Sequence, residues 1–106
     1  MCGITGIIST RPIKAQTIQA INDVLLHRGP DGAGLMLSAD QDRTGHWPGL
    51  IDYSPALSPY VALGHRRLSI VELSDLGHQP MVYQVLFDIT ANTEIYNHVE
   101  LRSELQ

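Results

Sequence analysis

The chain has 106 residues, 43% of them hydrophobic and 17% charged, with a formal net charge of −4, which is the composition of one small globular domain. It carries no basic stripe, no stretch near the ~18 apolar residues of a membrane span, and no signal peptide, so neither nucleic acid nor a membrane is expected as a partner. The only cysteine, Cys2, cannot form an internal disulfide, and these features together predict a cytoplasmic protein.

Hydrophobic periodicity predicts a strand, a helix and a second strand in the first part of the chain. Residues 4–9 are β-branched and apolar, as in a strand. Residues 14–27 are predicted to form a helix with a polar side that includes Asn22 and an apolar side built at three- and four-residue spacings. That apolar side consists of Ile18, Ile21, Val24 and Leu25. Gly29 is placed for a left-handed cap, and a short strand follows at 34–38.

The rest of the chain is predicted to alternate loops with strands. Residues 39–59 form one long loop in this prediction, and strand segments at 60–63 and 68–71 flank a Gly-His-Arg-Arg sequence. The strongest strand signal covers residues 82–90, without the glycine-rich turn that usually marks a hairpin. Asn97, with Glu100 three residues later, is typical of a capping box and predicts a helix that runs to the end of the chain.

The position of Cys2 gives the first indication of chemistry. Removal of Met1 would make Cys2 the first residue, with a thiol and a free α-amino group on the same residue. The α-amino group titrates near ~7.7–8.0 and the thiol near ~8.5, so the amine can act as the local base for the sulfur, as in other N-terminal nucleophiles. The alternative is that Cys2 is a small hydrophobic residue without a chemical role.

Five stretches in register point to one family. They are residues 1–4 (MCGI), 27–32 (HRGPDG), 64–70 (GHRRLSI), 77–81 (GHQPM) and 92–97 (NTEIYN). In this order and spacing they resemble the glutaminase domain of glutamine-hydrolysing asparagine synthetase, a class II glutamine amidotransferase within the N-terminal-nucleophile hydrolases. The resemblance covers nearly the whole chain. It implies an α+β fold, with antiparallel sheets stacked between helix layers as part of an αββα sandwich.

The same resemblance implies catalytic roles for three residues. Cys2 matches the nucleophile that attacks the side-chain amide of glutamine, forms a thioester and releases ammonia. Asn92 matches a donor to the oxyanion of the tetrahedral intermediate. Thr93 stands at the position of the second donor, which acts through its backbone N–H. Threonine replaces the glycine of the family pattern there, and a β-branched residue resists positive φ.

Substrate contacts are implied by the resemblance as well. Arg67 matches the arginine that grips the α-carboxylate of glutamine, and a guanidinium fork suits a carboxylate. Glu94 matches a residue that helps to hold the amino end. The remaining pocket-lining positions are Leu68, Ile70 and Val71. Arg28 and Asp31 lie in a motif that looks structural and is expected to tie loops near the nucleophile.

The chain is short for the family. Residues 1–106 are therefore interpreted as the N-terminal part of a class II glutamine amidotransferase domain, as a fragment or a degenerate copy, without a synthetase domain. No cofactor is expected in this segment, because ATP and Mg²⁺ are implied only for the synthetase domain. The five histidines show no metal-ligand spacing, so no metal is expected. An exposed sheet edge favours a homodimer or an aggregate over a stable monomer, unless the missing part of the domain is supplied elsewhere.

Two functions from different classes follow. The leading hypothesis is hydrolysis of L-glutamine to glutamate and ammonia, with the ammonia destined for the amidation of aspartate or a related carboxylate by the missing synthetase domain. The alternative is a catalytically silent binding or regulatory fragment that retains the fold, which Thr93 and the short chain favour. An unrelated thiol hydrolase is a distant third, because no pair of a base and an orienting residue is identifiable.

Overall fold

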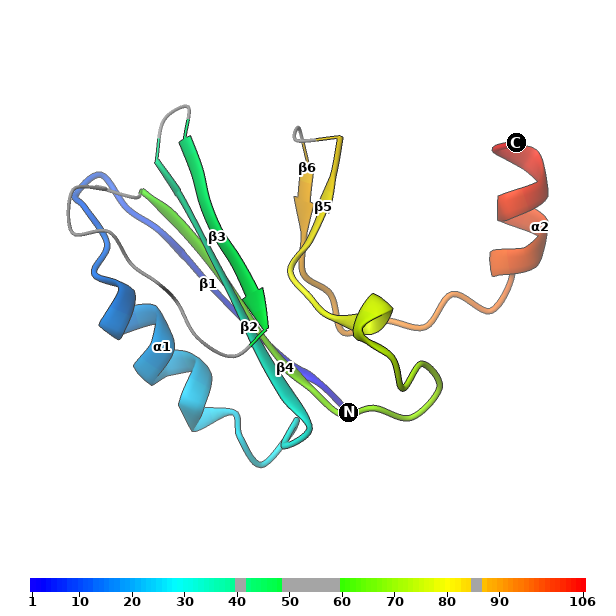
Figure 1. Cartoon of the computed structure of the whole chain (residues 1–106), viewed down its shortest axis with the longest axis horizontal. Coiled ribbons are helices and arrows are strands. Elements are labelled where there is room, and N and C mark those ends of the chain that lie inside the picture. The colour runs from blue at the N-terminus through cyan, green and yellow to red at the C-terminus, as the bar shows by residue number, and fades with distance from the viewer. Residues whose placement is uncertain (40–41, 49–59, 85–86) are drawn as a thin grey trace.

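The computed structural model describes residues 1–39, 42–48, 60–84 and 87–106, and within these ranges the chain is an α+β protein with two antiparallel sheets (Figure 1). Its elements are β1 (Gly3–Ile8), α1 (Ala15–Val24), β2 (Gly32–Ala39), β3 (Asp42–Pro48), β4 (Val61–Arg67), the 3₁₀ turn η1 (Asp75–Gly77), β5 (Met81–Tyr83), β6 (Phe87–Ile89) and α2 (His98–Glu104). One sheet has the order β1-β4-β2-β3 and the other is the β5-β6 hairpin.

The hydrophobic core lies between α1 and one face of the four-stranded sheet. It is built from Ile13, Ala15, Ile18, Leu35, Leu37 and Ala62, with Ile7 packed against it. Strand side chains alternate between the two faces, so every second residue of β2 and β4 reaches this core. The helix is amphipathic as predicted, but its buried residues, Ala15, Ile18 and Asn22, differ from the predicted apolar face.

Asn22 and its neighbours on α1 correct the predicted helix face. Asn22 is 1% exposed, whereas Ile21 and Val24 are 42% and 71% exposed. The side-chain amide of Asn22 donates to the carbonyl of His65 at 3.3 Å and accepts from the Thr5 hydroxyl at 3.4 Å. A buried polar group is stable when it is hydrogen-bonded, so this helix turns an amide toward the sheet and leaves two aliphatic residues in solvent.

Strand β4 lies between β1 and β2, which places its residues at the centre of the sheet. Arg66 points to the α1 side, where its guanidinium lies 3.8 Å from the carboxylate of Asp23. Arg67 therefore points to the opposite face. Gly29 passes directly over this strand: a Cβ there would lie 2.3 Å from the Arg66 carbonyl carbon. Close approach, and not the predicted left-handed cap, is the reason that glycine stands at position 29.

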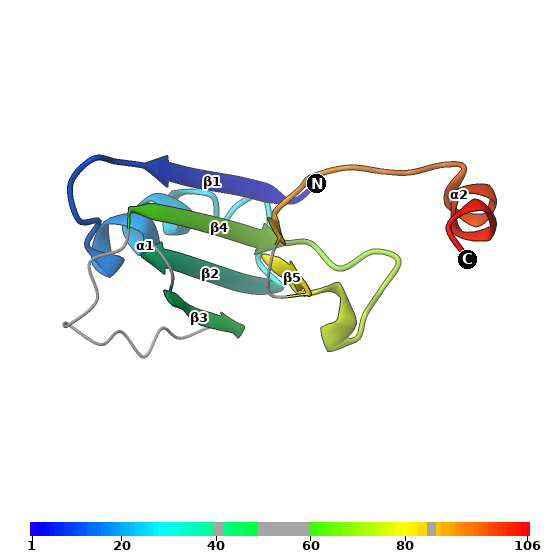
Figure 2. The same cartoon turned by 90° about the horizontal axis from the view of Figure 1, so that it is seen from above.

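The opposite face of the sheet is partly covered by the segment that follows β4. A Cβ at Gly34 would lie 1.8 Å from the carbonyl oxygen of Gln79, so the backbone of this segment lies directly on β2. Pro80, the next residue, is fully buried. Figure 2 shows the chain continuing past the end of the sheet, with α2 standing apart from it. The C-terminal elements are thus fixed to the scaffold near Gln79 and Pro80.

Several predicted boundaries are corrected. Part of the expected loop at 39–59 is strand β3, which pairs with β2, and residues 49–59 lie outside the described ranges. One strand, β4, replaces the two segments expected at 60–63 and 68–71. The single strand expected at 82–90 is the β5-β6 hairpin, where Gln84 adopts a φ of 50° in place of a glycine. Asn97 caps α2 by position, but its side chain makes no capping bond.

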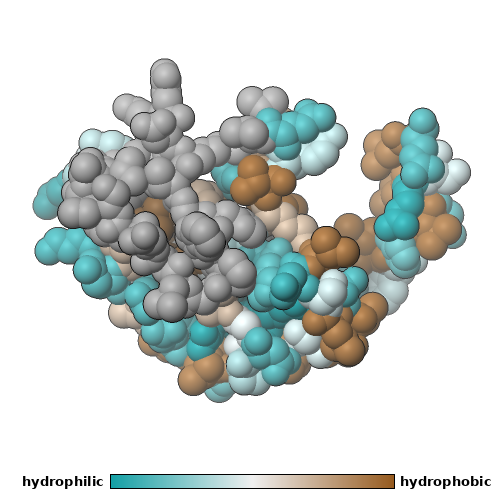
Figure 3. All heavy atoms as spheres, viewed as in Figure 1, coloured by the Kyte–Doolittle hydropathy of each residue, from teal (hydrophilic) through white to brown (hydrophobic). Residues whose placement is uncertain are grey.

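Aliphatic and aromatic side chains remain at the surface of the C-terminal half. Ile70, Val71, Leu76 and Phe87 are 65–95% exposed, and α2 buries none of its residues. Figure 3 shows hydrophobic surface over the segment after β4 and on α2. A search of the described ranges found no helix with the length and apolar character needed to span a bilayer.

Candidate active site

A cleft of about 610 Å³ opens where the start of β1, the end of β4 and the segment before α2 meet. It is bordered by every residue for which the sequence predicted a catalytic or substrate-binding role. These are Cys2, Arg67, Leu68, Ile70, Val71, Asn92, Thr93 and Glu94. Met1, His65, Glu72, Gly77, Gln79, Met81 and Tyr96 complete the lining. Residues from both ends of the chain, from Met1 to Tyr96, are thus brought to one hollow.

Cys2 is held at the cleft by its neighbours on two loops. Its Sγ lies 3.3 Å from the backbone nitrogen of Leu68, which donates to it, and 3.7 Å from the Leu68 carbonyl oxygen. The Cys2 carbonyl accepts from Nε of Arg28 at 3.2 Å. Asp31 accepts from the backbone N–H of Ser69 at 2.8 Å. These bonds confirm the prediction that Arg28 and Asp31 tie loops near Cys2.

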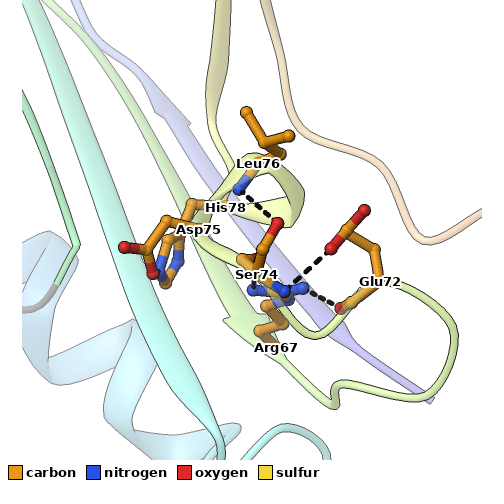
Figure 4. A network of polar contacts seen from close by, with 6 residues as sticks. All are labelled: Arg67, Glu72, Ser74, Asp75, Leu76 and His78. Atoms are coloured by element: carbon orange, nitrogen blue, oxygen red, sulfur yellow. Dashed lines mark hydrogen bonds and ion pairs between the residues drawn. The ribbon is translucent and has the colours of Figure 1, made fainter.

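Arg67 lies at the base of the cleft and is 6% exposed. Its Nη1 donates to the Ser74 carbonyl at 2.8 Å, and Nη2 donates to the Glu72 carbonyl (Figure 4). A guanidinium has five N–H donors, so three remain after these two bonds to the described part of the chain. A Cβ at Gly77 would lie 2.3 Å from Nη2 of Arg67, so a side chain there would require the guanidinium to move. Arg67 thus organises the loop around it and keeps donors for an anion.

The carboxylate of Glu72 belongs to that loop and is held by it. Hydrogen bonds from Ser74, followed by the nearby charge of Arg67, lower the pKa of Glu72. The backbone N–H of Ser74 donates to Oε1 of Glu72 at 2.8 Å, and the hydroxyl of Ser74 accepts from the backbone of Leu76 (Figure 4). The loop is therefore ordered by polar contacts, because its side chains are exposed.

The segment from Thr90 to Glu94 forms the opposite wall. The Thr90 hydroxyl donates to the Gly64 carbonyl at 3.4 Å, and the Ala91 N–H donates to Oε1 of Gln79 at 2.6 Å. Asn92 also borders a second hollow, of about 330 Å³, together with Cys2. Thr93 does not adopt positive φ, since Gln84 is the one non-glycine residue of the described ranges that does. The strain expected for threonine is therefore avoided by a different backbone conformation.

Glu94 and Tyr96 interact at the outer end of this wall. The Tyr96 hydroxyl donates to Oε2 of Glu94 at 2.8 Å, and this bond raises the pKa of Tyr96. Both side chains are exposed. The carboxylate of Glu94 therefore borders the cleft in a position that an amino group can reach from solvent.

His65 and Gln79 are two of the seven lining residues that were given no functional role from the sequence. His65 is 2% exposed, and its Nε2 is buried without a hydrogen-bond partner in the described part of the chain. Burial lowers the pKa of His65, the charge of Arg67 adds to this, and a hydrogen bond with the Ala91 backbone opposes it. Both residues lie inside motifs that carry the family resemblance. Their contacts join separate segments of the chain, so the spacing of residues within each motif could not predict them.

Metal-ligand types do not gather in this region. Within residues 1–39, 42–48, 60–84 and 87–106, no group of three or more His, Cys, Asp or Glu side chains could hold a metal ion.

Comparisons with known proteins show which family the chain resembles. The family model described as a glutamine amidotransferase domain matches residues 1–106. Glutamine-hydrolyzing asparagine synthetase 1 of Bacillus subtilis is 34% identical over 112 residues, covering all of this chain and 14% of its own length. The nodule asparagine synthetase of Pisum sativum is 32% identical over 109 residues, covering 99% and 15%. The asparagine synthetase of Zea mays is 31% identical over 110 residues, covering 100% and 15%.

These relatives are much longer than this chain. The chain spans 14–20% of the length of the first curated relatives that it matches. No solved structure gives a significant match to it.

Proposed function

This chain belongs to the glutamine amidotransferase domain family, and from that premise we propose that it hydrolyses L-glutamine to glutamate and ammonia through a thioester on Cys2. The relatives named above are glutamine-hydrolysing enzymes, which supports glutamine as the substrate at the level of the family. The single observation that carries the proposal is the cleft, where Cys2, Arg67 and Asn92 border the same space.

Acylation of Cys2 is the first half of the proposed reaction. With Met1 removed, the α-amino group takes the proton of the thiol, and the thiolate attacks the side-chain amide carbon of glutamine. The developing oxyanion accepts hydrogen bonds from the Asn92 side chain and the Thr93 backbone N–H. The C–N bond then breaks, the ammonium form of the amine returns its proton to the leaving nitrogen, and ammonia departs. The product is a glutamyl thioester on Sγ.

Deacylation is the second half. Water adds to the thioester carbonyl, again through an oxyanion held by the same donors, and the C–S bond breaks to give glutamate and the free thiol. The α-amino group accepts the proton of the attacking water and returns one to the sulfur. The sum is one glutamine and one water converted to one glutamate and one ammonia.

Substrate is held by the two walls of the cleft. The α-carboxylate of glutamine pairs with the donors of Arg67 that remain after its bonds to the loop carbonyls. Glu94 takes the α-amino group. The side chain extends toward Cys2 along a surface that Leu68, Ile70 and Val71 help to form. This orientation places the amide, and not the carboxylate, beside the sulfur.

The wider setting is also part of the proposal. The described sheets are proposed to be part of an αββα sandwich, and residues 1–106 the N-terminal part of the glutaminase domain. Ammonia would pass to a synthetase domain, which requires ATP and Mg²⁺ and amidates aspartate or a related carboxylate. A pairing of two copies through the sheet edge of β1 or β3 is proposed as well.

A silent binding module is the second candidate. Thr93 stands where the family pattern has glycine, and two donors of Arg67 are taken by the loop carbonyls of Glu72 and Ser74. Such a module would bind glutamine without releasing ammonia. Its fold and its cleft would be the same, so only a kinetic measurement separates the two functions.

The deciding experiment measures ammonia release and glutamine binding by the purified protein, with Cys2→Ala as the test variant. Ser103→Ala, an exposed change on α2, is the matched control. Turnover by the parent and by Ser103→Ala, with none by Cys2→Ala, supports the enzyme. Glutamine binding without turnover in all three supports the silent module. Neither binding nor turnover by a folded parent protein contradicts both.

A further inference from the structure

The segment that carries Asn92 is fixed to the rest of the molecule by a side chain on the opposite wall of the cleft. Oε1 of Gln79 accepts the backbone N–H of Ala91 at 2.6 Å. Ala91 directly precedes Asn92, and both Gln79 and Asn92 border the cleft with Cys2. Residues 92–97 are exposed, so little packing fixes their position.

Gln79 itself is firmly placed. Its carbonyl oxygen approaches Gly34 so closely that a Cβ there would lie 1.8 Å away, and Pro80 beside it is fully buried. The ring of the preceding residue, His78, lies over Gly32 of the same strand, where it would be 3.4 Å from a Cβ. The backbone that carries the Gln79 side chain therefore lies against β2, which is an inner strand of the four-stranded sheet.

A further contact joins the same segment to β4. The Thr90 hydroxyl donates to the Gly64 carbonyl at 3.4 Å. Thr90 directly precedes Ala91, so the segment is held from the strand side as well as by Gln79, and the chain leaves the scaffold at the residue before Asn92.

We propose that Gln79 is a positioning residue that aligns the Asn92 side chain with the Cys2 sulfur through its bond to the Ala91 N–H. The inference rests on the proposed function, because it gives Asn92 the oxyanion. A donor helps only at about 2.7–3.1 Å from the developing charge, and a displacement of about 1 Å can cost ~100-fold in rate. Arg67 is fixed by other contacts, so binding of glutamine depends little on Gln79.

The test compares Gln79→Met, which keeps the side-chain length and removes the carbonyl acceptor, with Gln79→Glu, which keeps an acceptor for the Ala91 N–H. Gln19→Met, an exposed change on α1, is the matched control. Two quantities are measured on each protein: hydrogen–deuterium exchange of the peptide that spans Ala91 to Glu94, and kcat and KM for ammonia release from glutamine.

Gln79→Met is expected to raise exchange at Ala91 and to lower kcat about 10- to 100-fold, with KM changed less than about threefold. Gln79→Glu is expected to restore most of both, and Gln19→Met to match the parent. Equal exchange and equal kcat in Gln79→Met and the parent would overturn the inference, as would a loss that Gln79→Glu does not repair.

The two proposals fail separately. A parent protein that releases no ammonia contradicts the enzyme and leaves the exchange measurement to decide whether Gln79 holds Ala91. Increased exchange at Ala91 in Gln79→Met alone then supports the positioning contact, and unchanged exchange overturns it.

Discussion

The scaffold, made of α1 and strands β1, β2 and β4, and the C-terminal segment of residues 68–106 are held together by different forces. All the core side chains belong to the scaffold and its flanking residues. In the C-terminal segment, Pro80 is the one buried residue among those described. Its order comes instead from hydrogen bonds, such as those of Arg67 to the Glu72 and Ser74 carbonyls and of Gln79 to Ala91.

The difference divides the proposed catalytic residues. Cys2 and Arg67 stand on strands or directly beside them, whereas Asn92, Thr93 and Glu94 belong to the open segment. Regions with few buried apolar contacts open at low free-energy cost. Binding of the α-carboxylate by Arg67 is therefore expected to tolerate change in residues 90–97. The contact of Glu94 with the α-amino group and the chemical step are expected to depend on a few polar contacts there.

The largest effect is expected from Arg67→Ala, compared with Arg66→Ala. Only Arg67 lies on the cleft face, so its loss removes the carboxylate partner and should raise KM for glutamine at least ~100-fold, the scale of a lost partner in a buried ion pair. Arg66 faces α1 and pairs with the exposed Asp23 at 3.8 Å. Its loss should change KM less than about threefold and lower the free energy of unfolding by about 1 kcal/mol.

Steady-state kinetics and urea unfolding on both variants make this measurement. Arg67→Lys adds a check, because it keeps the charge and loses the planar fork, and it should give an intermediate KM. Equal KM changes in Arg66→Ala and Arg67→Ala would mean that the assignment of the two strand faces to the two functions is wrong.

A smaller effect, in the opposite direction, is expected from Thr93→Gly. The change gives the backbone access to positive φ and removes a side chain beside the proposed oxyanion donor. Turnover should rise by up to ~10-fold, a fraction of the 10²–10³ assigned to a whole donor, with KM nearly constant. Ammonia release by the two proteins is compared at matched folding. A parent as fast as the glycine variant would show that Thr93 already presents its N–H well, and would remove the main chemical argument for a silent module.

The smallest effect concerns stability and pH, and it belongs to the scaffold. Burial lowers the pKa of His65 below its ordinary 6.5, with the charge of Arg67 and that of His78 acting in the same direction. The unfolded chain then binds more protons, so the stabilisation by neutral His65 is complete above pH 6.5 and is lost as the pH falls through the folded pKa. The slope is at most ~1.4 kcal/mol per pH unit, because one proton is linked.

Urea unfolding between pH 5 and 8 measures this slope in the parent, in His65→Gln and in a control, His98→Gln. His98 is exposed and bonds only its local backbone in the described chain. The slope should weaken in His65→Gln and persist in His98→Gln. An unchanged slope in His65→Gln would show that other groups account for the acid sensitivity.

How far the sequence predicts the molecule also differs between the two regions. The boundaries of β1, α1 and α2 follow from local periodicity and agree within a few residues. Strand β3 was missed because its sequence, DRTGHWP, lacks the alternating apolar pattern of a strand. The β5-β6 hairpin was missed because Gln84 occupies a turn position where glycine is the usual signal. Asn22 was placed on the wrong face, since its burial depends on bonds to Thr5 and His65.

The cleft shows the same limit. Motifs in register predicted the residues that border it, including Cys2, Arg67 and Asn92. They did not predict the loop around Arg67 or the bond between Gln79 and Ala91, because a hydrogen bond between separate segments depends on the folded geometry. The catalytic and binding roles of Cys2, Arg67 and Asn92 remain predictions, which are tested by kinetic measurements on the variants.

The central claim is that Cys2 acts as an N-terminal nucleophile, and intact-mass analysis of acid-quenched reactions tests it most directly. Two preparations are compared, one with Met1 removed and one that retains it, each mixed with glutamine and assayed in parallel for ammonia. A glutamyl adduct on Cys2, together with ammonia release, is expected only in the preparation that lacks Met1. Full-rate ammonia release by protein that retains Met1 would contradict it, because a capped Cys2 has no free amine to act as base.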